Sequence, residues 1–290
     1  MNLRSIGTRV KRDCRGNHFA RRTLGAMEAA FFDLDKTIIA KSSVLAFGRP
    51  LYREGLISRS VIVRSIYAQI VYMLVGADEA KMEKVRESML RLTKGWDQQH
   101  VAEIVRETLE ATIQPIIYAE ALDLIREHNA AGRRTVIISS SPFEVVAPLA
   151  DYLGVDDAIA TRAEIDDQGR YTGELEFYAY GEHKAEAIRA KAEAEGIDLS
   201  ASYAYSDSIT DLPMLESVGH PVVVNPDRDL ARAAAEREWE VRKFVRPVRL
   251  RDRMPVPTTA PTIAASSAAA AFGTGVVLYL IWRRRLSTAR

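Results

Sequence analysis

Short apolar runs alternate with longer amphipathic stretches along the middle of the 290-residue chain. The apolar runs are compact and bounded by charged or turn residues, which is typical of buried strands: residues 29–34, 134–138, 202–205 and 221–224. Residues 143–153 and 184–195 lie between such runs and read as helices, each ending at a glycine. This alternation predicts an α/β fold, with a Rossmann-like parallel sheet and helices on both of its faces.

A helical block interrupts the alternation after the first strand. Apolar residues at positions 61, 62, 66, 70 and 73 follow the i, i+3, i+4 spacing of a buried helix face, and residues 81–92 and 98–112 read similarly. We therefore expect a helical cap, residues 44–114, inserted into a core made of 27–43 and 115–245. Residues 171–180 are predicted to form a small hairpin with the segment near 159–165.

The first 26 residues are basic and lack apolar periodicity. They hold seven Lys or Arg against one Asp, so the rest of this chain of net charge +1 is acidic overall. They also lack the apolar stretch of a signal peptide. We interpret 1–26 as a disordered tail, with two alternatives: an anchor for anionic surfaces, or translation starting at Met27. The single cysteine, Cys14, lies here, so no disulfide framework is expected. No nucleic-acid partner is expected.

The C-terminal end has the pattern of a membrane anchor. No charged residue occurs from Met254 to Trp282, and Pro255, Pro257 and Pro261 indicate a linker, which we place at residues 246–261. Residues 262–282 are long enough to cross a bilayer, and a basic tail, 283–290, follows. We expect a single transmembrane helix; a flexible Ala-rich tail is the alternative. The expected location is a bacterial inner membrane, with the large domain in the cytoplasm and an undetermined helix orientation.

Polar residues follow three of the predicted strands. Asp33 and Asp35 are two apart at the first strand end, so they point the same way and favour a divalent cation such as Mg²⁺. Ser139 follows the second run, and residues 206–211 follow the third. Ligands of open α/β sheets bind beyond the carboxyl ends of the strands. With Lys184 at the start of a helix, these groups are predicted to converge on one edge.

This constellation resembles the haloacid dehalogenase superfamily, and within it the phosphoserine-phosphatase-like branch (subfamily IB). The resemblance covers residues 27–235 and rests on four motifs in order: Asp33-Leu34-Asp35-Lys36-Thr37, the strand-end Ser139, Lys184, and Asp207-Ser208-Ile209-Thr210-Asp211. It implies an Mg²⁺-dependent phosphomonoester hydrolase. The helical block matches the cap of this branch.

The resemblance also implies roles for the acidic residues. Asp33 is the expected nucleophile, which forms an aspartyl-phosphate intermediate. Asp35 is the expected acid and base, which protonates the leaving oxygen and then takes a proton from water. Mg²⁺ is expected to bind Asp33, the backbone carbonyl of Asp35, and Asp207. Asp211 is expected to orient Lys184 or a metal-bound water.

Two further groups are expected to contact the phosphate. Ser139 and the backbone near Ser140 are predicted to hold its oxygens, and Lys184 to neutralise charge on the transferring group. Helix capping remains an alternative role for Ser139 and for Asp211. Asp227 is interpreted as a helix cap.

The substrate stays open at this point. In phosphoserine phosphatases an acidic residue shortly after the first motif grips the substrate's amino group, and here that place is near Ser42. Phosphoserine is therefore one candidate among small or lipid phosphomonoesters. Two other functions stay open: a phosphotransferase using the same intermediate, and a non-catalytic membrane-bound interaction module.

Overall fold

The computed structural model describes residues 27–58 and 79–245, all within one compact unit of the chain. The predicted tail 1–26, the apolar positions 61–73, the linker 246–261, the membrane segment 262–282 and the tail 283–290 lie outside these ranges. Within the described residues, no helix is both long and apolar enough to cross a membrane.

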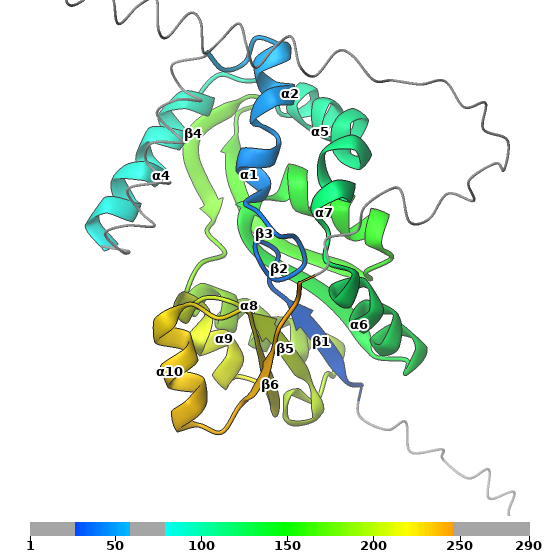
Figure 1. Cartoon of the computed structure of the whole chain (residues 1–290). Coiled ribbons are helices and arrows are strands. Elements are labelled where there is room, and N and C mark those ends of the chain that lie inside the picture. Colours follow the sequence, from blue (N-terminus) through cyan, green and yellow to red (C-terminus); the bar gives the residue numbers. More distant parts are fainter. Residues whose placement is uncertain (1–26, 59–78, 246–290) are drawn as a thin grey trace, which may run out of the picture. The chain divides into compact units, whose positions relative to one another are not determined.

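Strands and helices alternate as the sequence pattern predicts (Figure 1). The strands are β1 Ala29–Phe32, β2 Arg134–Pro142, β3 Asp157–Ile165, β4 Tyr171–Phe177, β5 Tyr203–Ser206, β6 His220–Val224 and β7 Glu240–Arg242. The helices are α1 Ser43–Ala46, α2 Gly48–Arg53, α4 Glu79–Thr93, α5 Gln98–Ile113, α6 Ala119–Ala130, α7 Phe143–Leu153, α8 Glu182–Glu195, α9 Leu212–Glu216 and α10 Arg228–Glu236. Three 3-10 turns, Gln114–Ile116, Leu199–Ala201 and Ile209–Asp211, complete the described elements.

Within the described residues, seven strands form one sheet in the order β4-β3-β2-β1-β5-β6-β7. Neighbouring strands are parallel except β3 and β4, which form the antiparallel hairpin that the sequence predicts. The parallel α/β class is therefore confirmed. β7 was not predicted, because its three residues carry no apolar run.

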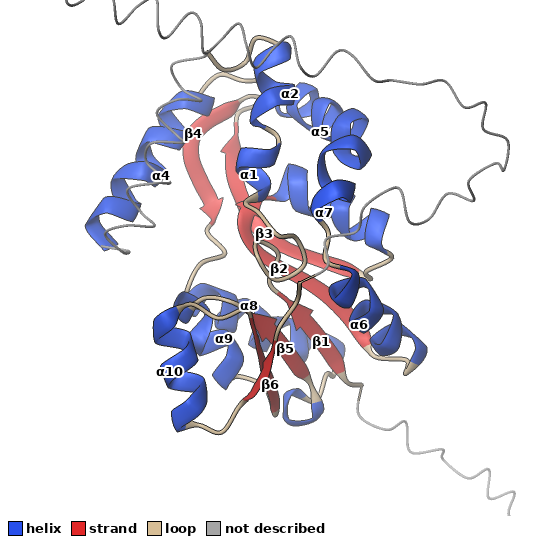
Figure 2. Ribbon diagram, viewed as in Figure 1, coloured by secondary structure: helices blue, strands red, loops and turns tan. Residues whose placement is uncertain are grey.

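Two apolar cores cover the two faces of the sheet. Ala30 and Phe32 face one core, which includes residues of α5, α6 and α7. Ala29 and Phe31 face the other core, which includes residues of α8, α9 and α10 (Figure 2). Side chains of a strand alternate between faces, so a strand buried on both sides needs an unbroken apolar run. That requirement explains the composition of β1.

Three of the shifts from the predicted boundaries bear on the site. β1 ends at Phe32, before Leu34, because the Leu34 carbonyl accepts three turn N–H groups, from Thr37, Ile38 and Ile39. β2 continues four residues beyond the predicted end, through its three serines to Pro142. α8 begins at Glu182, before Lys184. The early end of β1 places Asp33 in the turn that follows the strand, and the extension of β2 places its three serines within the strand.

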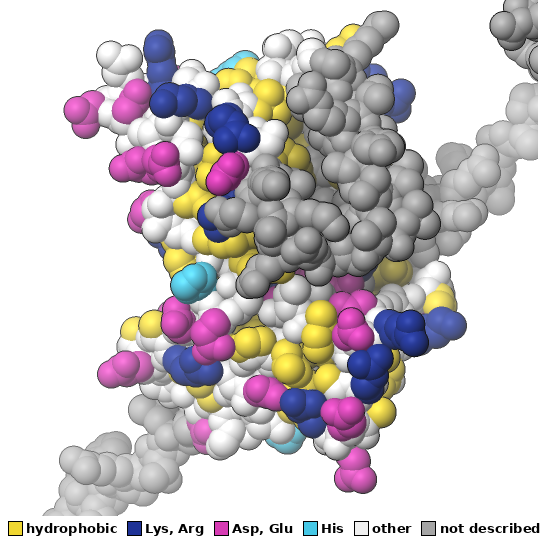
Figure 3. Space-filling model, turned by 90° about the vertical axis from the view of Figure 1, so that its left-hand side faces the viewer, with side chains coloured by type: hydrophobic (Ala, Val, Ile, Leu, Met, Phe, Trp, Pro, Cys, Tyr) yellow, Lys and Arg dark blue, Asp and Glu magenta, His cyan; other side chains and the backbone are white. Residues whose placement is uncertain are grey.

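Exposed ion pairs contribute little to this fold. Acidic and basic side chains are interspersed on the face shown in Figure 3. Pairs such as Arg189–Glu182 and Arg237–Glu216, both at 2.9 Å, join side chains that are at least one third exposed. Such pairs stabilise a protein by about 0–1 kcal/mol each. The two apolar cores are therefore the main source of stability.

Candidate active site

Three neighbouring strands bring the sequence motifs together. β1 lies between β2 and β5, and all three run parallel, so their carboxyl ends meet at one edge. Asp33 follows β1, Ser139 lies in β2, and Asp207 follows β5. The Asp33 N–H donates to the Tyr205 carbonyl at 2.9 Å, which fixes the start of the first motif against β5. The convergence predicted from the strand ends is therefore present.

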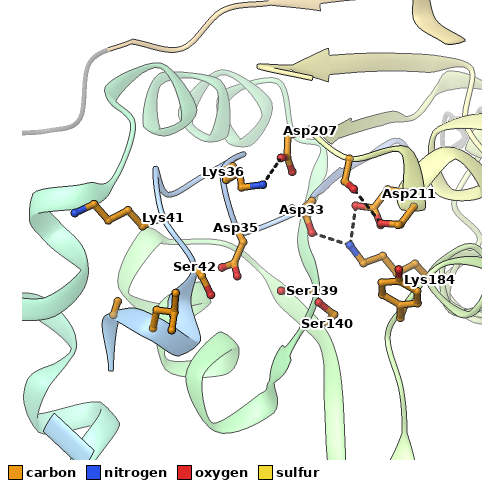
Figure 4. A pocket seen from close by; sticks show the side chains of 15 residues that line it. Asp33, Asp35, Lys36, Lys41, Ser42, Ser139, Ser140, Lys184, Asp207 and Asp211 are labelled. Atoms are coloured by element: carbon orange, nitrogen blue, oxygen red, sulfur yellow. Dashed lines mark hydrogen bonds and ion pairs between the residues drawn. The ribbon is translucent and has the colours of Figure 1, made fainter. Parts of the chain in front are cut away.

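Lys184 joins two of the carboxylates. Its Nζ donates to Asp33 Oδ1 at 2.7 Å and to Asp211 Oδ2 at 2.8 Å (Figure 4). Its side chain is only 3% exposed. Burial alone would lower the pKa of Lys184, but Asp211 and Asp33 outweigh it and hold that pKa above its ordinary value. Lys184 is therefore a charged lysine throughout the neutral pH range.

Asp211 positions Lys184. Its carboxylate also accepts a hydrogen bond from the Ser206 hydroxyl at 2.7 Å. Although Asp211 directly precedes α9, its side chain makes no capping hydrogen bond. The carboxylate therefore points toward the cavity edge and away from the helix start.

Asp33 is buried beside these charges. Burial raises the pKa of Asp33 well above its ordinary value, Lys184 opposes the rise, and Asp211 and Asp207 add to it. A cation between Asp33 and Asp207 would offset this repulsion. The electrostatics of the pair therefore suit a bound divalent ion.

Asp35 is held by the chain that follows it. Its Oδ1 accepts the Ser43 N–H at 2.9 Å. Burial raises the pKa of Asp35, while hydrogen bonds from Ser43 and Ser42 limit the rise. A carboxyl group that is more readily protonated than usual suits the acid and base role that the family resemblance implies.

Asp207 has a looser counter-ion. Lys36 Nζ lies 3.6 Å from Asp207 Oδ2, and the Lys36 side chain is 55% exposed. Burial raises the pKa of Asp207 to about 7, with Lys36 opposing the rise. Asp227 supports this loop: its N–H donates to the Asp207 carbonyl, and its carboxylate accepts the Ile209 N–H.

Asp227 is also the helix cap that the sequence predicts. Its Oδ1 accepts N–H groups from Asp229 and Leu230 at the start of α10, at 3.1 and 2.8 Å. One carboxylate thus ties a helix start to the loop that carries Asp207.

The serines of β2 form the third side of the site. Ser139 is buried, and its Oγ accepts the Ser141 N–H at 3.2 Å. The residue before α7 is Pro142, so Ser139 does not cap that helix. The Ser141 hydroxyl is 2.7 Å from the Ser43 hydroxyl, which links this strand end to α1. Ser140 is exposed and lines the cavity.

A cavity of about 530 Å³ opens between these groups. Its lining contains every residue that the sequence predicts for the site: Asp33, Asp35, Ser139, Ser140, Lys184, Asp207 and Asp211. On the side of α1 it is lined by Lys41, Ser42, Leu45 and Ala46. The cavity therefore has a highly charged side, with the carboxylates and Lys184, and an α1 side on which Lys41 is the single charged residue of the lining.

The described donor set fits a magnesium ion that keeps water ligands. Among the described residues, no three Asp, Glu, His or Cys side chains are clustered as a metal site. Two carboxylates, Asp33 and Asp207, do face the same cavity. Mg²⁺ is commonly held by one or two carboxylates, with water and substrate phosphate completing the octahedron. A third ligand from the Asp35 backbone, as the family resemblance implies, is compatible with this pattern.

Three residues that contribute to the site were not identified from the sequence. Lys36 belongs to the quoted first motif but was given no role. Ser43 and Ser206 hold Asp35 and Asp211. The position of Lys36, next to two candidate metal ligands in the sequence, indicated a residue of the site. The two serines gave none, because serine is common at helix starts and strand ends.

A model of haloacid dehalogenase-like hydrolases matches residues 30–216. The chain belongs to this family. Over 261 residues it is 51% identical to a protein of Mycobacterium tuberculosis named a probable phosphatase, with 89% of this chain and 90% of that one covered. Over 247 residues it is 35% identical to a protein of the same organism named phosphoserine phosphatase, with 84% and 79% covered.

A solved structure also shares the fold of this hydrolase. It is a protein of unknown function from Bordetella pertussis, 31% identical, with a TM-score of 0.65, covering 74% of this chain and 98% of that one. The family predicted from the four motifs is confirmed, and one of these relatives bears the name of the branch that the motifs resemble.

Proposed function

We propose that this hydrolase is a phosphatase that cleaves small phosphomonoesters with Mg²⁺ through a phosphorylated Asp33. The observation that carries the proposal is the Lys184 bridge: one buried ammonium lies within 2.8 Å of both Asp33 and Asp211, at the cavity shared with Asp35 and Asp207. A fixed cation beside a carboxylate nucleophile is what attack on an anionic phosphate requires.

The first half of the reaction transfers the phosphoryl group to the protein. Lys184 holds Oδ1 of Asp33, which leaves Oδ2 to attack phosphorus. A bond forms between this oxygen and phosphorus while the bond to the leaving oxygen breaks. Asp35 gives its proton to the leaving oxygen, and its raised pKa makes that proton available.

The second half regenerates Asp33. A water molecule attacks phosphorus, Asp35 takes its proton, and the bond to Asp33 breaks to release inorganic phosphate. Ser139 and the backbone near Ser140 are placed to hold the phosphate oxygens in both halves. Bound Mg²⁺, held by Asp33, Asp207 and the Asp35 backbone, would supply charge that offsets repulsion between two anions.

The cavity favours a small substrate. Its volume of about 530 Å³ falls within the range of pockets for small ligands. Its α1 wall offers Lys41, Ser42 and Leu45. By the family resemblance, Ser42 is near the place where phosphoserine phosphatases have an acidic residue for the amino group of the substrate. Phosphoserine therefore remains one candidate, beside phosphomonoesters whose leaving group lacks an amine. A lipid phosphomonoester is the alternative.

We also propose that residues 262–282 tether the enzyme to the inner membrane, with the catalytic domain in the cytoplasm. The support is the uncharged sequence from Met254 to Trp282. Fractionation of cells that express the full chain, beside a chain ending at residue 261, tests this. Recovery of both in the same soluble fraction contradicts the tether.

Hydrolysis of an aryl phosphate tests the activity. Phosphate release by the full chain is expected to require Mg²⁺ and to be abolished by Asp33→Asn. Asp229→Asn, an exposed carboxylate at α10, is the matched control and should keep full activity. Wild-type activity in Asp33→Asn, with circular dichroism unchanged, contradicts the proposal. Added alcohols test transfer: a phosphorylated alcohol as the main product would indicate a phosphotransferase.

A further inference from the structure

Lys36 has an unusual backbone conformation directly beside the two aspartates of the first motif. Its φ angle is 63°, in the left-handed region that glycine adopts without steric penalty. The turn holds it there, because Thr37, Ile38 and Ile39 all donate their N–H groups to the Leu34 carbonyl. The conformation directs a lysine side chain into the cavity at a position where glycine would be less strained.

The Lys36 ammonium contacts Asp207. Lys36 Nζ lies 3.6 Å from Asp207 Oδ2, and among the described residues it is the cation that forms an ion pair with this carboxylate. Figure 4 shows the Lys36 side chain reaching from the first motif to Asp207 across the cavity edge. Asp207 is one of the two carboxylates that fit Mg²⁺, so the ammonium contacts a carboxylate that the metal would also need.

The two lysines of the site differ in how firmly they are held. Lys184 has two carboxylate partners within 2.8 Å and is 3% exposed. Lys36 has one partner at 3.6 Å and is 55% exposed. A long, half-exposed side chain can leave its partner at little cost, whereas a buried and paired one cannot.

We propose that Lys36 is an exchangeable counter-ion. It neutralises Asp207 in the metal-free protein, moves away when Mg²⁺ takes that carboxylate, and then pairs with the phosphate of the substrate in the same cavity. The inference rests on the proposed function. Its physical basis is that an ammonium and a dication repel each other at one carboxylate, while both attract a phosphate dianion.

This role predicts two effects of opposite sign. Lys36→Met removes the charge and keeps the length of the side chain, so Mg²⁺ affinity should rise about three- to tenfold. With Mg²⁺ saturating, affinity for inorganic phosphate should fall by about the same factor. A purely structural lysine would lower both affinities or leave both unchanged.

Calorimetric titration of the metal-free full-length protein measures the first effect. Mg²⁺ is titrated into wild type, Lys36→Met, Lys36→Gly and Lys36→Arg, and inorganic phosphate is then titrated at saturating Mg²⁺. Lys36→Gly should behave as Lys36→Met, although it relieves the backbone strain, and Lys36→Arg should resemble wild type. Melting curves check that each variant is folded.

Lys41→Met is the matched control. Lys41 lines the same cavity, but its side chain is directed away from the carboxylates in Figure 4. Lys41→Met removes the same charge as Lys36→Met, yet its Mg²⁺ affinity should stay within about twofold of wild type.

The outcomes separate this inference from the proposed function. Higher Mg²⁺ affinity with lower phosphate affinity in both neutral variants supports it. Unchanged or reduced Mg²⁺ affinity in Lys36→Met, while wild type binds Mg²⁺ and hydrolyses aryl phosphate, overturns the inference alone. Wild type that binds no Mg²⁺ and releases no phosphate overturns both.

Discussion

Two basic side chains are buried in two regions of the protein, and one of them is charged while the other is neutral at pH 7. Lys184, at the sheet edge, has carboxylates at 2.7 and 2.8 Å. His128, in α6, packs against the rings of Phe32, Tyr203 and Tyr205 and shares a hydrogen bond of 2.8 Å with the Tyr205 hydroxyl. Its other ring nitrogen, Nδ1, has no partner among the described residues.

The partners decide which base stays charged. Burial, together with the nearby positive charges of Arg133 and Arg242, lowers the pKa of His128 to about 4. Burial acts on Lys184 in the same direction, but Asp211 and Asp33 reverse the effect. The comparison teaches that the buried ammonium of Lys184 keeps its charge because two carboxylates enclose it, whereas the buried imidazole of His128 shares its hydrogen bond with a neutral hydroxyl. Lys184 therefore places a charge at the cavity, where the proposed chemistry uses it, and His128 is part of the packing.

Removing the Lys184 charge should have the largest effect. Lys184→Met leaves two buried carboxylates without their cation and should lower the free energy of unfolding by about 3–5 kcal/mol and abolish activity. Lys191→Met is the matched control, because Lys191 on the same helix also pairs with two carboxylates, Asp157 and Glu195, but does not line the cavity. Urea unfolding and phosphate release measure both; equal losses of activity in the two variants would contradict the comparison.

Acid should unfold the protein partly through His128. Its pKa in the folded state, about 4, lies below the ordinary 6.5, so the unfolded chain binds more protons between these values. The contribution is fully present above pH 6.5 and is lost as the pH falls toward 4. At pH 5 the loss is about 2 kcal/mol. His128→Gln should lack this pH-dependent contribution to stability. The unfolding free energy of the variant should therefore fall less than that of wild type between pH 7.5 and 5. Equal falls would show that His128 is not neutralised by burial.

Asp211→Asn should have an intermediate effect. The amide keeps the shape but leaves Lys184 with one charged partner, and the Ser206 hydroxyl with a weaker acceptor. We expect a loss of about 1.5 kcal/mol in stability and a ten- to hundredfold fall in activity. Steady-state kinetics at saturating Mg²⁺ and urea unfolding check this. Activity within twofold of wild type would mean that Asp33 alone positions Lys184.

Lys36→Met should have the smallest effect on stability. Its ion pair with Asp207 is half-exposed, so its loss should change the unfolding free energy by less than about 1 kcal/mol. Thermal melting beside Lys184→Met measures the contrast between the two lysines. A loss as large as that of Lys184→Met would place Lys36 among the groups that hold the fold.

Sequence reasoning recovered the architecture and the convergence of the site because both follow from local patterns. Apolar runs placed β1, β2, β5 and β6, and their polar ends had to meet at one edge of a parallel sheet. The partners of each side chain could not be predicted in this way. The contact between Lys36 and Asp207, and that between Ser43 and Ser141, join residues far apart in the chain. They depend on the turn after β1 and on the extension of β2, and neither boundary follows from hydrophobic periodicity.

Mass spectrometry of the phosphorylated enzyme tests the central claim most directly. Wild type and Asp35→Asn are mixed with Mg²⁺ and an aryl phosphate, whose phenolate leaves without needing a proton. The samples are then quenched in acid and digested. Asp35→Asn should accumulate a phosphoryl group on the peptide that contains Asp33, because the water that releases it lacks its base. Phosphate release in wild type together with a phosphoryl group on any other residue, or with none on Asp33 in Asp35→Asn, would contradict the account.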